Sequence, residues 1–218
     1  MAAILAAFAL SLDAVAADAS RWGKGYVPNH PVLAQDGKSF NFYDDLIQDR
    51  IAVVSFIYTS CSEICPVATA RLSQLQEKLG DHMGREAFGF THCPDVCPTT
   101  LMDWSNVLAS LGPDGDRLKV LFISVDPERD TPAALKSYMT SFDPRITALT
   151  GSAGELAAVA AAFGAHYTKM VGKDGSVSFD HSIKTYILDR KAQLAALSDP
   201  QSEENSRAAR LRKLIGRD

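Results

Sequence analysis

The chain has 218 residues, of which 46% are hydrophobic and 22% are charged, and its net charge is −4. This composition is typical of a soluble globular protein that can bury a core without disulfide staples. The negative net charge gives no indication of a basic surface that binds nucleic acid. Four cysteines are too few for a disulfide scaffold, and their arrangement in two CxxxC pairs favours site chemistry instead.

Residues 1–17 are predicted to be a secretory signal peptide of atypical form. The apolar run Ala2–Leu12 has the length of a signal-peptide hydrophobic region and is too short to cross a bilayer, and Ala14-Val15-Ala16 forms a cleavage site. The usual Lys or Arg residues before the run are missing, so a truncated start or a short N-terminal helix is the alternative. We therefore expect a periplasmic or envelope-facing protein, secreted or N-terminally anchored.

Residues 18–50 are predicted to form an N-terminal arm followed by a β-hairpin. Asp36-Gly37 lies between the short extended runs Val32–Gln35 and Ser39–Phe42, and Asp-Gly in such a place is a strong hairpin signal. Tyr43–Ile47 then resembles a helical turn with acidic residues at its start.

Residues 51–198 alternate between strand and helix patterns. The run at 51–58 is nearly all apolar, β-branched or aromatic, which is typical of a strand buried on both faces. Further strands are expected near 86–91, 118–125, 146–149, 166–170, 176–179 and 184–188, and helices near 67–80, 98–112, 132–142 and 152–163. This alternation predicts an α/β sheet built from βαβ units, followed by a charged helical tail over 199–218 whose charges face solvent.

Both CxxxC motifs come directly after a predicted strand, at the start of a predicted helix. Residues four apart share one face of a helix, so each pair of thiols could close a disulfide or bind one soft metal ion. The partial positive charge at a helix N-terminus also stabilises thiolates. The two pairs are Cys61/Cys65 and Cys93/Cys97.

The two motifs belong to an internal duplication. Residues 56–80 align with 88–112 after a shift of 32 positions, with Cys61 on Cys93 and Cys65 on Cys97. The repeated strand–CxxxC–helix units span 51–80 and 86–112. We expect one fold with an extra βα unit, or a fusion of two relatives, in which a single unit occupies the central position.

Three motifs, in this order, resemble the Sco/SenC family. They are F-G-F-T-H-C-P-D-V-C-P-T-T-L (88–101), L-F-I-S-V-D-P-E-R-D-T-P (121–132) and F-D-H-S (179–182). The resemblance covers 86–190, and 22–80 looks like part of a second member. It implies a thioredoxin-like central sheet flanked by helices, and copper, as Cu(I) with Cu(II) as a second state, bound for the assembly of cytochrome c oxidase.

The resemblance also implies the metal ligands. Two cysteines and a distant histidine map onto Cys93, Cys97 and His181, and thiolates with an imidazole suit Cu(I) independently. His181 follows Cys97 by 84 positions, an interval that holds the elements expected in the family, and Asp180 is a candidate to orient its ring. Cys61 and Cys65 form the second candidate pair, because the stronger strand leads into them.

Each of these candidate residues also has an interpretation that involves no copper. Either cysteine pair could be two buried free thiols or a structural disulfide, and the first pair could be a relic of the duplication. All four cysteines could also bind one zinc ion. His92 could tune a neighbouring thiolate, whereas His30, His82 and His166 are expected to be structural or solvent-facing. The loop after the strand at 118–125 holds Asp126, Arg129 and Asp130. Functional residues often lie in such loops of α/β sheets. The alternative is that these residues only hold the loop in shape through helix caps and an ion pair. Trp104 is expected in the core.

Two functions follow from the cysteine pair. The first, not an enzyme, is a metallochaperone that passes copper to the copper-site subunit of cytochrome c oxidase, next to the membrane. The second is a thiol–disulfide oxidoreductase in which Cys93 and Cys97 form the redox pair that keeps the oxidase cysteines reduced. Other copper chaperones or thiol reductants are further expected partners. A peroxidase, which needs a reactive thiolate near a polar loop, is a third reading.

Overall fold

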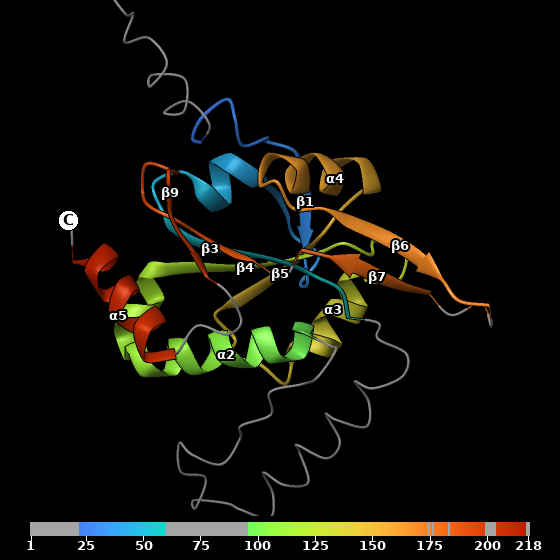
Figure 1. Ribbon diagram of the computed structural model, residues 1–218. Coiled ribbons are helices and arrows are strands. Elements are labelled where there is room, and N and C mark those ends of the chain that lie inside the picture. The colour runs from blue at the N-terminus through green and yellow to red at the C-terminus, as the bar shows by residue number, and fades with distance from the viewer. Residues whose placement is uncertain are drawn as a thin grey trace, which may run out of the picture.

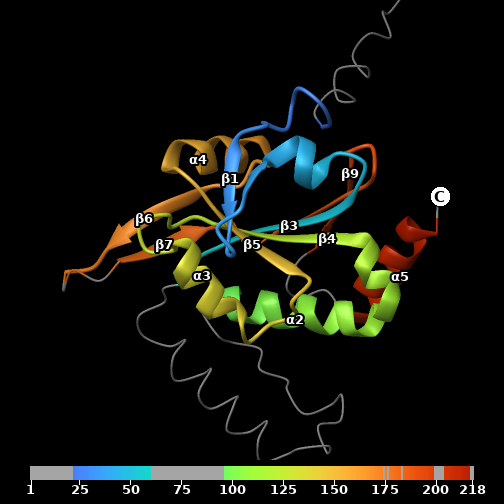
Figure 2. The same cartoon turned by 180° about the vertical axis from the view of Figure 1, so that it is seen from behind.

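A computed structural model describes residues 22–59, 96–173, 175, 177–182, 184–198 and 204–216. A seven-stranded sheet forms the middle layer, with strand order β2-β1-β5-β4-β3-β8-β9. Figures 1 and 2 show helix α4 on one face of this sheet and helices α2 and α3 on the other. The α/β architecture with a central sheet flanked by helices is therefore confirmed.

The centre of the sheet is parallel. Strands β3 (Ile51–Ile57), β4 (Leu118–Ser124) and β5 (Ile146–Thr150) pair parallel to one another. All seven residues of β3 are buried, because helices cover both faces. The crossover β4–α3–β5 is one of the expected βαβ units.

Antiparallel strands complete both edges. The predicted hairpin forms from β1 (Pro31–Ala34) and β2 (Ser39–Asn41), turns at Gly37 with a φ of 83°, and joins the sheet through β5. On the other side β8 (Thr185–Leu188) pairs with β3, and β9 (Leu194–Ser198) pairs with β8. Strand β9 was not predicted, because Leu-Ala-Ala-Leu-Ser alternates only weakly.

The helices begin where their capping residues predict. Thr131 caps α3 (Pro132–Met139), and Ser152 and Glu155 form the expected capping box of α4 (Ala153–Ala162). A π-helical turn, η1 (Phe42–Ile47), follows β2, and a 3₁₀ turn, η3 (Gly112–Arg117), joins α2 to β4.

The central strand and the helix that follows it come from different copies of the repeat. Strand β3 is the strand of the first unit, whereas α2 (Val96–Leu111) is the helix of the second. Helix α2 contributes Leu101, Trp104, Val107 and Leu108 to the same core as β3. The predicted helix 67–80 and strand 86–91 lie outside the described residues.

The C-terminal helix α5 (Glu204–Ile215) packs against α2 rather than standing free. Ala208, Leu211 and Ile215 are buried. Arg207 forms an ion pair with Asp103 at 3.2 Å, and its guanidinium carbon lies 5.8 Å from the Trp104 ring centre. The expectation of a fully solvated charged face is therefore wrong for Arg207, which is 7% exposed. No described helix is both long and apolar enough to span a bilayer.

Candidate metal centre

The predicted ligands are only partly within the described residues. His181 ends strand β7, and Cys97 is the second residue of α2. Cys61, Cys65 and Cys93 lie outside the described residues, and for Cys97 only the backbone is described. Within the described ranges, no three His, Cys, Asp or Glu side chains gather closely enough to hold a metal ion.

The described parts of the site converge on one end of the molecule. Strands β6 (Tyr167–Val171) and β7 (Val177–His181) form a separate two-stranded sheet. Figures 1 and 2 place this hairpin, the C-terminal end of β3 and the start of α2 at the same end of the fold. Both cysteine motifs continue from this end: Cys61 follows Thr59 by two residues, and Cys93 precedes α2 by three.

The imidazole of His181 packs against the end of β3. Its ring centre lies 5.6 Å from that of Tyr58, edge to face. Nδ1 lies 3.0 Å from the carbonyl oxygen of Ser182, and a ring that is protonated on Nδ1 donates to this oxygen and has its lone pair on Nε2. Asp180, the candidate orienting partner, is exposed and its charge acts on the ring, and the Ser182 carbonyl lies within hydrogen-bond distance of Nδ1.

Burial lowers the pKa of His181 below its ordinary value of 6.5. Hydrogen bonding to the backbone of Ser182 and Phe56, and the charge of Asp180, oppose this effect without cancelling it. The environment therefore favours the neutral imidazole, which is the form that binds metals.

We expect this lowered pKa to make the stability of the metal-free protein depend on pH. Below 6.5 the unfolded chain takes up a proton at His181 before the folded protein does, so this contribution to stability is lost as pH falls through the folded pKa. Urea unfolding at about pH 7.5 and about pH 5.5 measures it. His181→Gln should lose part of the pH dependence, whereas His30→Gln, at an exposed position, should keep it. An unchanged dependence in His181→Gln would contradict the assignment.

The loop after β4 ties the strand ends together. The Asp130 carboxylate accepts hydrogen bonds from the Thr59 N–H at 3.2 Å and from the hydroxyls of Thr59 and Ser124. Asp130 is fully buried, and burial raises its pKa, although these donors oppose the rise. The network fixes the last described residue of the first unit to the loop, close to where the chain enters the first cysteine motif.

The same loop reaches the hairpin through two charged residues. The Arg129 guanidinium donates to Asp126 and, at 3.1 Å, to the carbonyl of Val177. Lys169 pairs with Glu128 at 2.6 Å. Both interpretations of this loop, a functional and a purely structural one, are therefore supported. An ion pair holds the loop in shape, and the loop contacts the hairpin that carries the candidate ligand.

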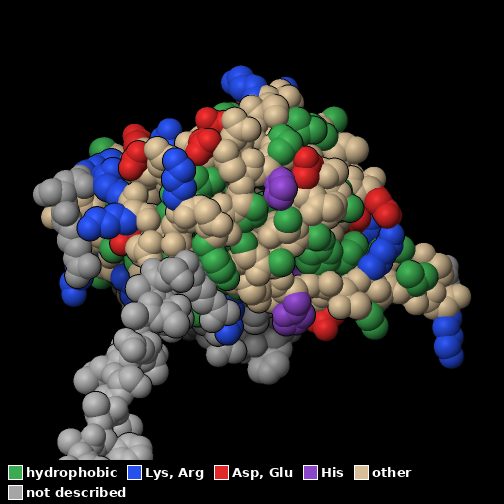
Figure 3. Space-filling view, turned by 90° about the horizontal axis from the view of Figure 1, so that it is seen from above, with side chains coloured by type: hydrophobic (Ala, Val, Ile, Leu, Met, Phe, Trp, Pro, Cys, Tyr) green, Lys and Arg blue, Asp and Glu red, His purple; other side chains and the backbone are tan. Residues whose placement is uncertain are grey.

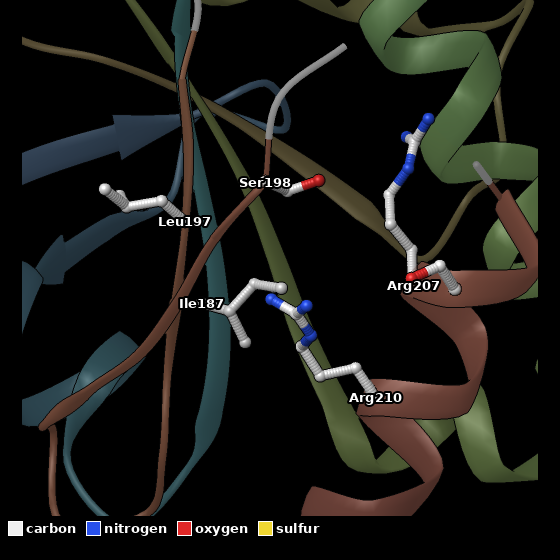
Figure 4. Close-up of a pocket in the computed structure, with 6 residues that line it drawn as sticks. Ile187, Leu197, Ser198, Arg207 and Arg210 are labelled. Atoms are coloured by element: carbon white, nitrogen blue, oxygen red, sulfur yellow. The ribbon is translucent and has the colours of Figure 1, made fainter. Parts of the chain in front are cut away.

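Among the other described histidines, His166 is bonded to the residue that follows His181. His166 bonds Ser182 through its backbone and its ring, and His30 is exposed. A pocket of about 70 Å³ lies between β8, β9 and α5 (Figure 4), and α5 is at the opposite end of the molecule from the hairpin. The face seen in Figure 3 scatters acidic and basic side chains rather than gathering one basic patch.

Sequence reasoning missed several residues of the site. Tyr58 was read as the end of a strand, but its ring contacts both His181 and Phe179. Thr59 and Ser124 supply the hydroxyls around Asp130. Their position at the carboxyl ends of parallel strands was the available signal, because side chains there meet at one edge of the sheet.

The fold is that of a thioredoxin-like α/β protein, and the candidate metal site lies at the end of its central strand. A family model described as SCO1/SenC matches residues 26–87 and again 85–216, so the match continues from one copy of the repeat into the other. The chain belongs to the SCO1/SenC family.

Relatives and solved structures agree with this assignment. A SCO2-like protein of Rickettsia conorii is 36% identical over 162 residues, covering 72% of this chain and 62% of that protein. Mitochondrial SCO2 of Saccharomyces cerevisiae is 35% identical over 201 residues, covering 91% and 56%. The structure of Bradyrhizobium japonicum ScoI with copper bound superimposes with a TM-score of 0.64 at 30% identity, covering 86% and 99%. The chain thus spans less than two thirds of the curated relatives' length.

Proposed function

We propose that this protein binds copper and delivers it to the binuclear copper site of cytochrome c oxidase during assembly. The single observation that carries the proposal is His181, a half-buried imidazole with a lowered pKa that is held against the end of the central strand. The ScoI structure solved with copper bound, at 30% identity, supports the choice of metal. Delivery to the oxidase rests on the family resemblance alone.

The donor set suits copper on chemical grounds. Thiolates and an imidazole select Cu(I), with Cu(II) as a second state. In the tautomer that donates from Nδ1 to the Ser182 carbonyl, Nε2 is the atom of the neutral ring that can bind a metal. With two thiolates this makes a three-donor site, from which an incoming thiolate of a recipient can take the metal by ligand exchange.

We propose Cys93 and Cys97 as the two thiolates. They lead directly into α2, which is packed into the core, and Cys97 lies in its first turn. Cys61 and Cys65 stay the second candidate pair, because the first unit's strand takes the central position and Thr59 is fixed by Asp130. Mutation of each pair in turn decides between them.

The alternative function is a thiol–disulfide oxidoreductase that keeps the oxidase cysteines reduced. One thiolate of Cys93/Cys97 would attack a partner disulfide and the other would resolve the mixed disulfide. Dithiol exchange requires no histidine, whereas copper binding does, which separates the two functions.

We expect His181→Ala to lower Cu(I) affinity by on the order of 100-fold, because a whole ligand is lost. The rate at which the reduced protein reduces a disulfide should be unchanged. Competition with a Cu(I) chelator measures the first and a thiol–disulfide exchange assay the second. His30→Ala is the matched control at an exposed histidine. Unchanged copper affinity in His181→Ala would refute the ligand assignment.

The oxidase copper-site subunit is the proposed recipient, with other copper chaperones or thiol reductants as further partners. We propose that this exchange takes place in the periplasm or at the envelope face, next to the membrane that holds the oxidase. An oxidising compartment explains why a reductant would be needed, since two thiols must be reduced before they bind Cu(I).

A further inference from the structure

The sheet that carries His181 is separate from the main sheet. Strands β6 and β7 pair antiparallel, with Tyr167 opposite His181 and Lys169 opposite Phe179. They form their own two-stranded sheet, which projects from the body in Figures 1 and 2. Because an isolated hairpin is marginally stable, the position of His181 relative to β3 depends on contacts with side chains of the body.

One face of β7 makes these contacts. Val177, Phe179 and His181 alternate along the strand and therefore share a face. The Tyr58 ring packs on this face, with its centre 5.4 Å from that of Phe179 and 5.6 Å from that of His181. The Arg129 guanidinium carbon lies 6.0 Å from the Phe179 ring centre. Phe179 is thus contacted both by Tyr58, from β3, and by Arg129.

Arg129 joins this face to the end of β4. Its Nε donates to the carboxylate of Asp126, which is 1% exposed, and its Nη1 donates to the Val177 carbonyl at 3.1 Å. Asp126 is itself anchored, because its N–H donates to the Ser124 hydroxyl at 3.0 Å. Nη2 is buried without a hydrogen-bond partner in the described part of the chain, so two hydrogen bonds and one ring contact define the side chain.

A second link beside it is weaker. Lys169 and Glu128 form their ion pair at the surface, with side chains 41% and 72% exposed. Water and salt screen such pairs, and they contribute little to structure. Arg129 is the more buried of the two links, with 31% of its side chain exposed.

We propose that Arg129 is a positioning residue for His181, which holds the β6–β7 hairpin so that the imidazole stays at the end of β3. The inference rests on the proposed copper function. Arg129 acts through Val177 and Phe179, whose carbonyl and ring it contacts. A planar guanidinium can bond a carboxylate and a carbonyl at once and lie over a ring, which a single lysine ammonium cannot do.

The test uses Arg129→Lys, which keeps a positive charge for the buried Asp126. Arg145→Lys is the matched control, because Arg145 is 29% exposed and also joins a carboxylate, Asp143, to a backbone carbonyl, Gly112. We expect Arg129→Lys to weaken Cu(I) binding about tenfold, as outer residues of metal sites do, and Arg145→Lys to leave it unchanged. In a His181→Ala background, Arg129→Lys should cause no further loss.

Amide hydrogen exchange of the metal-free proteins supplies the readout that does not depend on copper. Arg129→Lys should speed exchange in β6 and β7 while β3 and β4 keep their protection. The inference is overturned if Arg129→Lys binds Cu(I) with wild-type affinity, or if it loses as much affinity in the His181→Ala background as in the wild type. It is also overturned if amide exchange in the hairpin of Arg129→Lys keeps its wild-type rate. If His181→Ala binds copper normally, the ligand assignment fails instead, and exchange in the hairpin still decides the role of Arg129.

Discussion

Replacing both cysteines of the second pair, Cys93→Ser/Cys97→Ser, should lower Cu(I) affinity by on the order of 1,000-fold or more. Thiolates are the donors that select Cu(I), and a serine hydroxyl is a poor substitute for them. Of the three proposed ligands, only His181 would then remain. The measurement is copper stoichiometry after dialysis, followed by competition with a Cu(I) chelator.

The matched variant is Cys61→Ser/Cys65→Ser, which changes the same residue types in the first unit. We expect it to bind one copper ion with an affinity within about threefold of wild type. If the two variants exchange these results, the first pair is the site and the proposed choice is wrong. If each loses part of the binding, both pairs take part. The comparison is informative because the described residues that flank the two motifs, the end of β3 and the start of α2, lie at one end of the fold.

The second large effect concerns stability. Trp104→Ala should lower the free energy of unfolding by about 3–5 kcal/mol, since it removes the largest fully buried side chain and leaves a cavity. It also removes the ring beneath Arg207, which helps to hold α5 on α2. Urea unfolding followed by far-ultraviolet circular dichroism measures the loss.

A control on the same helix separates burial from helix formation. Met102 is 38% exposed, and Met102→Ala should change the free energy of unfolding by less than about 1 kcal/mol. A similar small effect of Trp104→Ala would mean that the second unit's helix does not build the core. It would also weaken the case for Cys93 and Cys97, which depends on that helix.

Local patterns predicted most of the fold. The uninterrupted apolar runs at β3 and β4, the Asp-Gly turn and the caps of α3 and α4 each depend on neighbouring residues in the sequence. The unusually apolar pattern of 51–58 also indicated correctly that this strand could take the central position. The sequence did not indicate that the helix packed behind it would come from the other unit.

Features that depend on distant residues were not predictable. The sequence predicts that strand β7 stops at Phe179, but it continues to His181. Its last two residues are extended because they pair with β6, which the local sequence does not indicate. The hydrogen bonds that Asp130 accepts from Thr59 and Ser124 join segments up to 71 positions apart. The burial of Arg207 likewise requires Asp103 and Trp104 from a helix far away in the chain.

The mixed origin of β3 and α2 has a consequence for how such a chain could arise and be shortened. Thr59 and Thr91 occupy equivalent positions in the repeat, so residues 60–91 are one full period of 32. Excising them in frame joins Thr59 to His92 and yields F-I-Y-T-H-C-P-D-V-C-P, a single motif leading into α2. Every described residue would remain in the chain. The excised period carries the first motif, Cys61 and Cys65, and the sequence that remains carries the second motif, Cys93 and Cys97.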